Sequence, residues 1–437
     1  MRLLFIFRLY SGFTTSIASG RWEPTGLPDV YKLLEGVAAR GIQAKVVFLA
    51  REEVETEFVE SLSFPGIDIE FHIIPAFRLP DWLVSLIWPR RLGARCARLF
   101  NDIRQFRRVL ALHGRRGQAD LVYLDRRNIV LAALFKFKGW RTVVRFHGVA
   151  DWNRERGPLA TLVRQPFYYF ALKAPFDLVL SSEDGSPAQP FFDRYLAPAT
   201  PYRVLVNGVD LKPTAEGKAA ALREKYGFTE PWPILLYVSR LTVDKGAQEF
   251  LDAVIEIDRR CPRFYVIIVA GGSDPASAKD FLERAGLGAR AAFERSLPHS
   301  DILAYFQEAD IFVSPNKLAN LTNTVLEAIA VGICIVMLGK DSVTHADVST
   351  EALVPDDVVV RIPRFSGAQG LIEALVPLLE NPARIEEYSR RTKSFATDFL
   401  RSWDERIEDE IALLEWVDGG PRAGRADCNA TAARGML

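Results

Sequence analysis

A carboxylate, Glu327, is predicted to lie about one turn inside a helix that follows a short apolar strand. The stretch Asn316–Gly332 reads N-K-L-A-N-L-T-N-T-V-L-E-A-I-A-V-G, after the strand-like run Ile311–Pro315. A helix N-terminus presents unbonded N–H groups and partial positive charge, which suit a phosphate. A carboxylate one turn further can accept hydrogen bonds from a sugar diol. Two interpretations follow: a turn that holds a nucleotide-sugar diphosphate, or an ordinary N-capped helix packed on a sheet.

Two cations form the second candidate group. The stretch Leu235–Gly246 reads L-L-Y-V-S-R-L-T-V-D-K-G, in which a buried strand leads to Arg240 and a turn leads to Lys245. Cations on one strand-to-helix loop can converge on a diphosphate, Arg through a forked contact and Lys as a point charge. Taken alone, the same residues also fit a surface loop with two solvated cations.

Together these motifs resemble those of the family 4 (group 1) glycosyltransferases, which have the GT-B fold. That family carries G/S-R-L-x-x-x-K-G where this chain has Ser239–Gly246, and Glu327 matches the second Glu of its donor-binding motif. The first Glu of the motif falls on Ala319, which cannot hydrogen-bond a sugar. We expect Asn320, or backbone groups of residues 321–323, to take its place. The resemblance covers about residues 1–415 and is strongest over 235–335.

The resemblance implies a role for several residues. Arg240 and Lys245 would stabilise the leaving diphosphate, where electrostatic help is most effective. The third implied catalytic residue is His147, in V-V-R-F-H-G-V-A-D-W, which would reach the donor sugar; a histidine at the end of a buried strand is also often only structural. The implied donor-binding residues are Thr322, Asn323, Thr324, Val325, Glu327, Gly271, Leu297, Gly12 and Phe13.

Four of these positions lie in motifs that are weaker when taken alone. Gly271, in V-I-I-V-A-G-G-S, would approach the nucleotide, and Leu297 the base. Gly12 and Phe13 lie in Ser11–Gly20, S-G-F-T-T-S-I-A-S-G, whose small residues predict a loop that lets the backbone approach a ligand. No G-x-G-x-x-G motif is present, so a dinucleotide oxidoreductase is disfavoured.

The resemblance also implies the type of reaction. Members of the family retain the anomeric configuration, generally without an assigned protein nucleophile, and the leaving diphosphate helps to take the acceptor proton. The chain has no D-x-D motif, which disfavours the metal-dependent fold for glycosyl transfer. We therefore expect no cofactor and no metal, with Arg240, Lys245 and the helix end at Thr324 supplying the positive field.

Composition bounds the class of protein. The chain has 437 residues, enough for two domains of ordinary size. Its 55 basic and 55 acidic residues balance, so charge gives no case for a nucleic-acid partner. The cysteines are scattered and lack metal-site spacing: Cys96, Cys261, Cys334 and Cys428.

Apolar strand-like runs alternate with helix-like segments through both halves, which predicts βαβ units and mostly parallel sheets. We expect an α/β fold of two Rossmann-like doubly wound domains facing a cleft, with ligands at the C-terminal ends of the strands. Residues 1–212 would form an acceptor-side domain and 213–398 a nucleotide-sugar-binding domain. The final helical stretch, about 385–414, would send a helix over 399–416 back to the N-terminal domain, before a disordered tail over 417–437. The expected strands are Leu3–Phe7, Ala44–Leu49, Ile69–Ile74, Leu121–Leu124, Thr142–Phe146, Leu178–Ser181, Val204–Val206, Ile234–Val238, Phe264–Val269, Ala292–Glu294, Ile311–Val313, Cys334–Met337 and Val358–Arg361.

A basic segment, Leu83–Gly117, holds many arginines and a single acid, Asp102, and apolar residues that include Trp82 and Trp88 precede these arginines. Such a segment can lie on an anionic membrane surface, close to a lipid-linked saccharide. The alternative is a solvated helix whose apolar face packs on the first domain. We expect a cytoplasmic protein, and the first interpretation would place it peripherally at the inner face of the cell membrane.

The sequence therefore predicts a retaining hexosyltransferase. It would move a hexose from a nucleotide-diphosphate sugar to a glycan or lipid-linked acceptor, in surface polysaccharide or glycolipid synthesis. Two alternatives stay open: a GT-B nucleotide-sugar 2-epimerase, and a non-catalytic nucleotide-sugar-binding subunit, which Ala319 makes conceivable.

Overall fold

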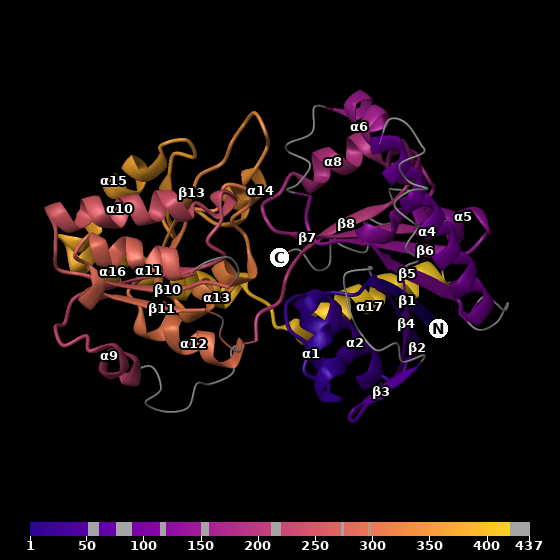
Figure 1. Cartoon of the computed structure of the whole chain (residues 1–437), viewed down its shortest axis with the longest axis horizontal. Coiled ribbons are helices and arrows are strands. Elements are labelled where there is room, and N and C mark those ends of the chain that lie inside the picture. Colours follow the sequence, from indigo (N-terminus) through magenta and orange to yellow (C-terminus); the bar gives the residue numbers. More distant parts are fainter. Residues whose placement is uncertain are drawn as a thin grey trace. The chain divides into compact units, whose positions relative to one another are not determined.

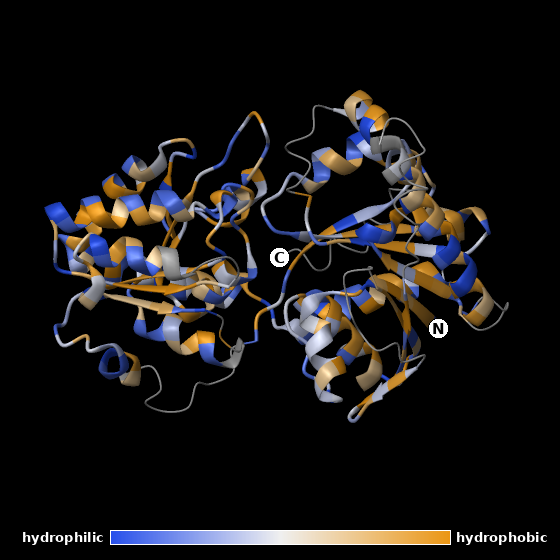
Figure 2. Ribbon diagram, viewed as in Figure 1, coloured by the Kyte–Doolittle hydropathy of each residue, from blue (hydrophilic) through white to orange (hydrophobic). Residues whose placement is uncertain are grey.

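The structure is a computed structural model that describes residues 1–50, 61–75, 90–113, 119–149, 157–210, 220–271, 275–295, 297 and 299–419. The chain forms two compact units. The first contains Met1–Ser182, Ala188–Val206 and the chain from Asp404 onward, and the second contains Glu183–Pro187 and Asn207–Trp403. In each unit, helices cover a central sheet whose strands are mostly apolar (Figures 1 and 2).

The first unit is built on an eight-stranded sheet in the order β3-β4-β2-β1-β5-β6-β7-β8. The pairings β4–β2, β2–β1, β1–β5, β5–β6 and β6–β7 are parallel, whereas the short edge strand β3 pairs antiparallel with β4. The strands are β1 (Arg2–Arg8), β2 (Gln43–Leu49), β3 (Leu62–Phe64), β4 (Ile67–Ile74), β5 (Leu121–Asp125), β6 (Arg141–Phe146), β7 (Leu178–Glu183) and β8 (Tyr202–Val206). All the strands expected in this half are present, and β3 is an addition.

The helices of the first unit follow the predicted alternation with one exception. Residues 11–20, expected as a loop, instead form the helix α1 up to Ser19, with Gly20 left-handed at its end. The helices are α1 (Ser11–Ser19), α2 (Pro28–Ala39), α4 (Arg90–His113), η1 (Arg126–Asn128), α5 (Ile129–Phe137), α6 (Pro158–Arg164), α7 (Pro166–Leu172), α8 (Ala188–Tyr195) and, in large part, α17 (Trp403–Gly419).

The second unit has a six-stranded, fully parallel sheet in the order β11-β10-β9-β12-β13-β14. The chain runs outward from β9 in one direction and from β12 in the other, so the winding reverses between these two neighbours. Ligands of doubly wound sheets bind outside the carboxyl ends of the strands at such a reversal. The strands are β9 (Ile234–Val238), β10 (Tyr265–Val269), β11 (Ala291–Glu294), β12 (Ile311–Ser314), β13 (Cys334–Leu338) and β14 (Val360–Ile362).

The helices of the second unit pack their apolar faces on this sheet. Buried residues of β9, β10, β12 and β13 join those of α10 and α15 in one core. The helices are α9 (Ala220–Tyr226), η3 (Val243–Lys245), α10 (Ala247–Arg260), α11 (Pro275–Arg284), η4 (Gly288–Arg290), α12 (His299–Glu308), α13 (Asn323–Val331), α14 (Val348–Leu353), α15 (Gly367–Leu379) and α16 (Pro382–Phe399). The predicted α/β fold class, with two doubly wound parallel sheets, is confirmed.

The C-terminal region differs from a single helical stretch. It forms α16 and α17, separated at residues 400–402, and Asp404 onward belongs to the first unit. The tail expected from residue 417 overlaps the end of α17 and otherwise lies outside the described residues. None of the described helices could span a lipid bilayer, since none combines the required length with a sufficiently apolar stretch.

Candidate active site

The loop after β9 carries the two candidate cations. Arg240 is exposed, and Lys245 is half-buried at the end of η3. Between them the backbone is held by one hydroxyl: Oη of Tyr237, a core residue of β9, lies 3.1 Å from the carbonyl of Arg240 and 3.2 Å from that of Lys245. Burial raises the pKa of Tyr237, so its hydroxyl keeps the proton that it donates. The loop that presents the cations is therefore anchored to the sheet.

This loop packs directly on the loop that follows β12. Gly246 has a positive φ of 67°, and a Cβ there would lie 2.3 Å from the carbonyl oxygen of Pro315. Only glycine allows this approach. The N–H of Lys317 also donates to the carbonyl of Asp244 at 2.9 Å. These contacts join the Arg240–Lys245 loop and the loop before α13 at the point where the winding of the sheet reverses.

The N-terminus of α13 supplies the third part of the site. The hydroxyls of Thr322 and Thr324 lie 2.9 Å apart, and Asn207 Nδ2 donates to Asn323 Oδ1 at 2.8 Å. Val325 is fully buried, so only its backbone N–H can serve a ligand. The first N–H groups of a helix have no acceptor within it, and they carry the positive end of its dipole. Glu327 is half-buried in the next part of the helix.

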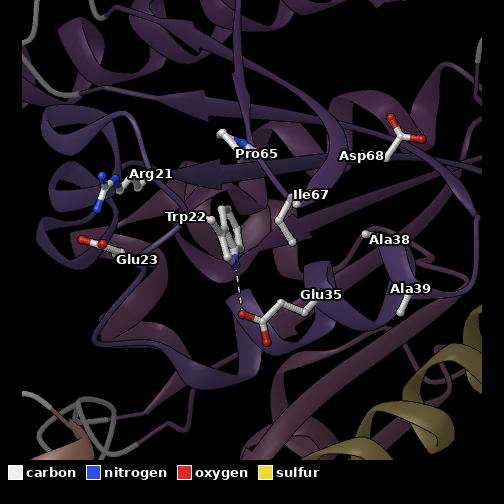
Figure 3. A pocket seen from close by; sticks show the side chains of 10 residues that line it. Arg21, Trp22, Glu23, Glu35, Ala38, Ala39, Pro65, Ile67 and Asp68 are labelled. Carbon is white, nitrogen blue, oxygen red and sulfur yellow. Dashed lines mark hydrogen bonds between the residues drawn. The ribbon is translucent and has the colours of Figure 1, made fainter.

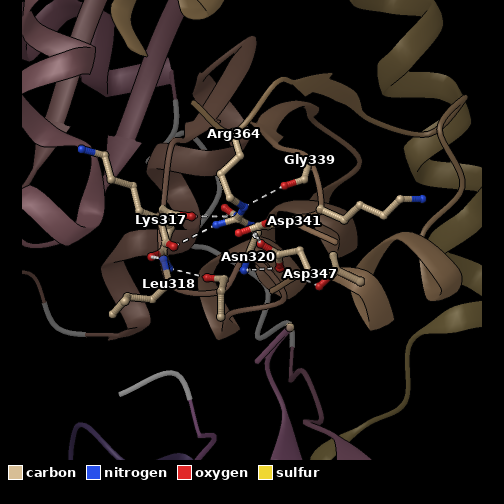
Figure 4. Close-up of polar contacts among 12 residues, drawn as sticks. Lys317, Leu318, Asn320, Gly339, Asp341, Asp347 and Arg364 are labelled. Atoms are coloured by element: carbon tan, nitrogen blue, oxygen red, sulfur yellow. Dashed lines mark hydrogen bonds and ion pairs between the residues drawn. The ribbon is translucent and has the colours of Figure 1, made fainter. Parts of the chain in front are cut away.

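A buried polar cluster shapes the loop between β12 and α13 (Figure 4). Asn320 is fully buried; its backbone N–H and its Nδ2 donate to the two carboxylate oxygens of Asp347 at 2.7 and 2.8 Å. Arg364 pairs with the same carboxylate, and its Nη1 donates to the carbonyl of Lys317 at 2.8 Å. Burial raises the pKa of Asp347, although Arg364 and Asn320 favour its ionised form. Buried hydrogen bonds within the protein thus hold the conformation of this loop, and no ligand is needed for it.

The same cluster bears on the missing glutamate. Ala319 is 3% exposed, and Asn316 Nδ2 donates to its carbonyl. Asn320, expected as one replacement for the carboxylate, is 0% exposed and bonded to Asp347, so its side chain cannot reach a sugar. That expectation was wrong. The other expected replacement, by backbone groups of residues 321–323, stays a prediction.

Gly271 and Leu297 lie where the chain leaves neighbouring strands. Gly271 follows β10 and Leu297 follows β11, and both are half-buried. Residues 272–274, 296 and 298 lie outside the described residues, so the structure gives only the strand ends that carry these two candidates.

Gly12 and Phe13 lie on α1, in the first unit. A Cβ on Gly12 would overlap the carbonyl of Thr25, whose N–H donates to Gly12 O at 3.0 Å. The Phe13 ring is fully buried and stacks on Phe48 at 4.1 Å between centroids. Both side-chain positions are taken up by packing, so only the backbone of this turn is left to meet a ligand.

His147 follows β6 and is the partly exposed member of a buried ionic group. Its Nδ1 lies 2.6 Å from Oδ2 of Asp29 on α2, and 24% of its side chain is exposed. Arg145, two residues earlier, is 1% exposed and contacts both Asp29 and Glu410 of α17. Sequence reasoning found His147 but missed Asp29, because the pairing comes from elements more than a hundred residues apart.

A separate pocket of about 770 Å³ opens on the first unit between α2 and the turn that joins β3 to β4 (Figure 3). Trp22 lies in it and donates from Nε1 to Glu35 at 2.9 Å. None of the predicted site residues lines this pocket. In the part of the chain that the structure describes, no three His, Cys, Asp or Glu side chains gather as metal ligands. Independence from a metal stays a prediction.

Residues 219–348 match the family model of the group 1 glycosyl transferases. This segment belongs to that family. It includes Arg240, Lys245, Gly271, Leu297 and the Thr322–Glu327 turn. The chain is 26% identical over 168 residues to an alpha-D-kanosaminyltransferase of Streptomyces kanamyceticus, covering 38% of this chain and 41% of the relative. It is 29% identical over 124 residues to a GDP-mannose-dependent phosphatidylinositol monomannoside mannosyltransferase of Mycolicibacterium smegmatis, covering 27% of this chain and 32% of the relative. The chain thus matches less than half the length of these two relatives.

Solved structures extend the likeness from the group 1 segment to the whole fold. Sucrose-phosphate synthase from Thermosynechococcus elongatus superimposes with a TM-score of 0.67 at 18% identity, over 95% of this chain and 99% of that chain. Anabaena HepE in complex with UDP gives 0.64 at 16% identity, over 95% and 99%. At such identities the likeness concerns the fold alone. The fold is GT-B, as the sequence predicts.

Proposed function

We propose that the protein is a retaining glycosyltransferase that moves a hexose from a nucleotide-diphosphate sugar to a glycan or lipid-linked acceptor. One observation carries the proposal: the loop with Arg240 and Lys245 is fastened to the loop before α13 through Gly246 and Pro315. The loop with both cations and the loop that leads into the helix N-terminus therefore lie together at the reversal of the sheet, the place where doubly wound folds bind nucleotides. The group 1 segment spans these elements.

The charges at this place fit the departure of a diphosphate. Negative charge grows on the leaving group as the bond from the sugar to its oxygen breaks. Arg240, Lys245 and the N–H groups of α13 oppose that charge from fixed positions, which is the arrangement that lowers such a barrier. Glu327 would accept hydrogen bonds from hydroxyls of the donor nucleoside, and His147 would contact the sugar. The acceptor oxygen would attack the same face that the diphosphate leaves, and the diphosphate would take its proton.

We further propose a peripheral position at the inner face of the cell membrane, with synthesis of a surface polysaccharide or glycolipid as the setting. The support is local: α4 holds seven arginines and one acid, Asp102, which pairs with Arg8. Beside it, Arg95 of α4 donates to the carbonyl of Val163 on α6 at 3.2 Å, and the apolar helix α6 exposes Leu159 and Val163 (Figure 2).

Nucleotide binding tests the proposal. Titration calorimetry with UDP, GDP, ADP and CMP sugars should reveal one preferred donor. Arg240→Ala and Lys245→Ala should each weaken its binding at least about tenfold, because a hydrogen bond to a charged group contributes about 1.5–3 kcal/mol. Arg259→Ala is the control: Arg259 is a 71% exposed arginine on α10 that pairs with Glu256. Equal effects of all three variants would contradict the proposed site.

A second function, a non-catalytic nucleotide-sugar-binding subunit, is favoured by Ala319 alone. Donor binding without transfer to any of a broad panel of glycans and lipid-linked saccharides would support it over the transferase. Release of a changed sugar nucleotide without an acceptor would instead indicate an epimerase.

A further inference from the structure

His147 is oriented by a single carboxylate. Its Nδ1 lies 2.6 Å from Oδ2 of Asp29, a short contact between two groups on separate elements. Within the described residues, no hydrogen bond is formed by the other ring nitrogen, Nε2, and 24% of the side chain is exposed. One edge of the ring is thus bound to the protein, and the other is available.

Asp29 is held in its charged form. Burial acts against ionisation, but His147 and Arg145 outweigh it and keep the pKa of Asp29 below its usual range. A carboxylate can only accept hydrogen bonds, so the proton between the two groups lies on Nδ1 of the imidazole. In the neutral ring, Nε2 then carries the lone pair.

The carboxylate itself cannot turn away. Oδ2 of Asp29 also accepts from Arg145 Nη2 at 3.1 Å and from Ser182 Oγ at 3.3 Å. Arg145 is fixed in turn by Glu410, which is fully buried and accepts from Tyr123 Oη at 2.5 Å. Five elements (α2, β5, β6, β7 and α17) therefore converge behind one ring.

We propose that Asp29 is the positioning residue of His147: it fixes the Nδ1–H tautomer, so that Nε2 presents an acceptor to a ligand hydroxyl. The last clause rests on the proposed function, in which His147 contacts the donor sugar. The first clause stands on the first unit alone. A purely structural Asp29, present only to balance the charge of Arg145, would leave the tautomer of His147 unspecified.

The tautomer can be read directly in the ligand-free protein. Long-range proton–nitrogen NMR of ¹⁵N-histidine-labelled protein, at a pH where the ring is neutral, distinguishes a protonated ring nitrogen from an unprotonated one. His147→Gln identifies the signals of this ring among the five histidines. We expect the proton on Nδ1 in the wild type. A wild-type ring with its proton on Nε2 would overturn the proposal without any variant.

Variants then separate positioning from charge balance. Asp29→Leu removes the acceptor, and the Nδ1–H tautomer should be lost. Asp29→Asn places an amide oxygen where Oδ2 accepts its three hydrogen bonds, so it should keep that tautomer although the charge is gone. Ser182→Ala, which removes another partner of Oδ2, should also keep it. An unchanged tautomer in Asp29→Leu would contradict the proposal; if that variant does not fold, loss of the tautomer in Asp29→Asn would do so.

These measurements need no substrate, so they succeed or fail independently of glycosyl transfer. If the protein is the proposed transferase, kcat/KM should fall in Asp29→Leu and recover at least partly in Asp29→Asn. A chain with the predicted tautomers but without transfer would retain the positioning role and lose the proposed function.

Discussion

Asn320 donates twice to one carboxylate: its backbone nitrogen lies 2.7 Å from Oδ1 of Asp347, and its Nδ2 lies 2.8 Å from Oδ2. Asp347 adopts a left-handed backbone, with φ of 55°, which is uncommon for a residue other than glycine. Arg364 pairs with the same carboxylate and reaches the carbonyl of Lys317. A buried ionic cluster, and not a ligand, therefore holds the conformation of the turn that leads into α13.

Asp347→Ala should lower the free energy of unfolding of the second unit by about 3–5 kcal/mol, because it leaves the buried guanidinium of Arg364 without its charge partner. Denaturant unfolding measures this. Asp356→Ala is the matched control: Asp356 pairs with Arg361 but is 81% exposed, so its loss should cost below about 1 kcal/mol. Similar losses in both variants would show that burial of the Asp347 pair does not matter.

Gly246→Ala should both destabilise the protein and weaken donor binding. The left-handed backbone costs an alanine about 1–2 kcal/mol, and the new methyl group would also collide with Pro315. Gly41→Ala separates the two effects, since Gly41 has a similar φ of 63° but nothing within 4 Å of its Cβ position. We expect Gly246→Ala to cost at least about 1 kcal/mol more than Gly41→Ala. Unchanged donor binding would mean that the contact between the two loops does not shape the site.

The strands of both sheets were predicted from the sequence, but the buried residues that position the candidate site were not. Each expected strand is present because runs such as Ile234–Val238 and Leu121–Leu124 are apolar on both faces, which is typical of parallel strands. The helix α1 was missed because its glycine, serines and threonines favour a loop, whereas the packing of Phe13 on Phe48 favours the helix. Local preference was overridden by tertiary contacts.

Asp29 and Asp347 show why the remainder of the site could not be predicted. Each is a single carboxylate outside any motif, and its partners lie on other elements: Arg145 is 116 residues from Asp29, and Arg364 and Asn320 are 17 and 27 residues from Asp347. Motifs such as the S-R-L-x-x-x-K-G run indicate the residues that would face the proposed ligand. Buried residues that position the motif residues have no recognisable sequence pattern, because many different buried pairs can stabilise the same conformation.

Ala319→Glu should destabilise the protein rather than restore a stronger site. The alanine is 3% exposed, so a carboxylate there must lose water or push its surroundings apart, at about 1–3 kcal/mol. Ala289→Glu, at an exposed position of η4, should leave the melting temperature nearly unchanged. If instead Ala319→Glu kept its stability and bound donor more tightly, the position would open to the ligand.

The half-buried Glu183 should make stability depend on pH. Burial, together with the nearby Asp184 and Asp347, raises its pKa to about 7, despite hydrogen bonds from Ser349 and Gly185. Between the ordinary value of 4.5 and about 7, the unfolded chain releases this proton while the folded chain keeps it. Stability from this group therefore falls as pH rises through that range.

Glu183→Gln should remove this loss. The melting temperature of the variant, relative to the wild type, should rise between pH 5 and pH 8. Glu373→Gln, which changes an exposed glutamate of α15, should show no such trend. A difference between Glu183→Gln and the wild type that stays constant with pH would contradict the assignment.

Binding to anionic vesicles tests the surface of α4, α6 and α7. The exposed side chains of these helices include positive groups, at Arg107 and Arg108, and apolar groups, at Leu159 (79% exposed), Val163 (73%) and Phe170 (62%). Each arginine near an anionic surface contributes about 1 kcal/mol, so Arg107→Gln with Arg108→Gln should lower the partition coefficient about 30-fold. The control is the equally adjacent pair Arg259→Gln with Arg260→Gln on α10, which should have little effect.

The contribution of the apolar side chains to vesicle binding can be measured in the same way, by cosedimentation of the protein with vesicles. Leu159→Ser with Val163→Ser should weaken binding to vesicles of phosphatidylglycerol and phosphatidylcholine, because each side chain loses the gain from burial in the interface. Val343→Ser, at an 87% exposed valine of the second unit, should not. Phosphatidylcholine alone should bind weakly, since charge and apolar area must act together. Equal binding to both vesicle types would contradict membrane binding by this surface, as would equal losses of vesicle binding in the α4 and α10 double variants. In either case α4 would be the solvated helix of the alternative interpretation.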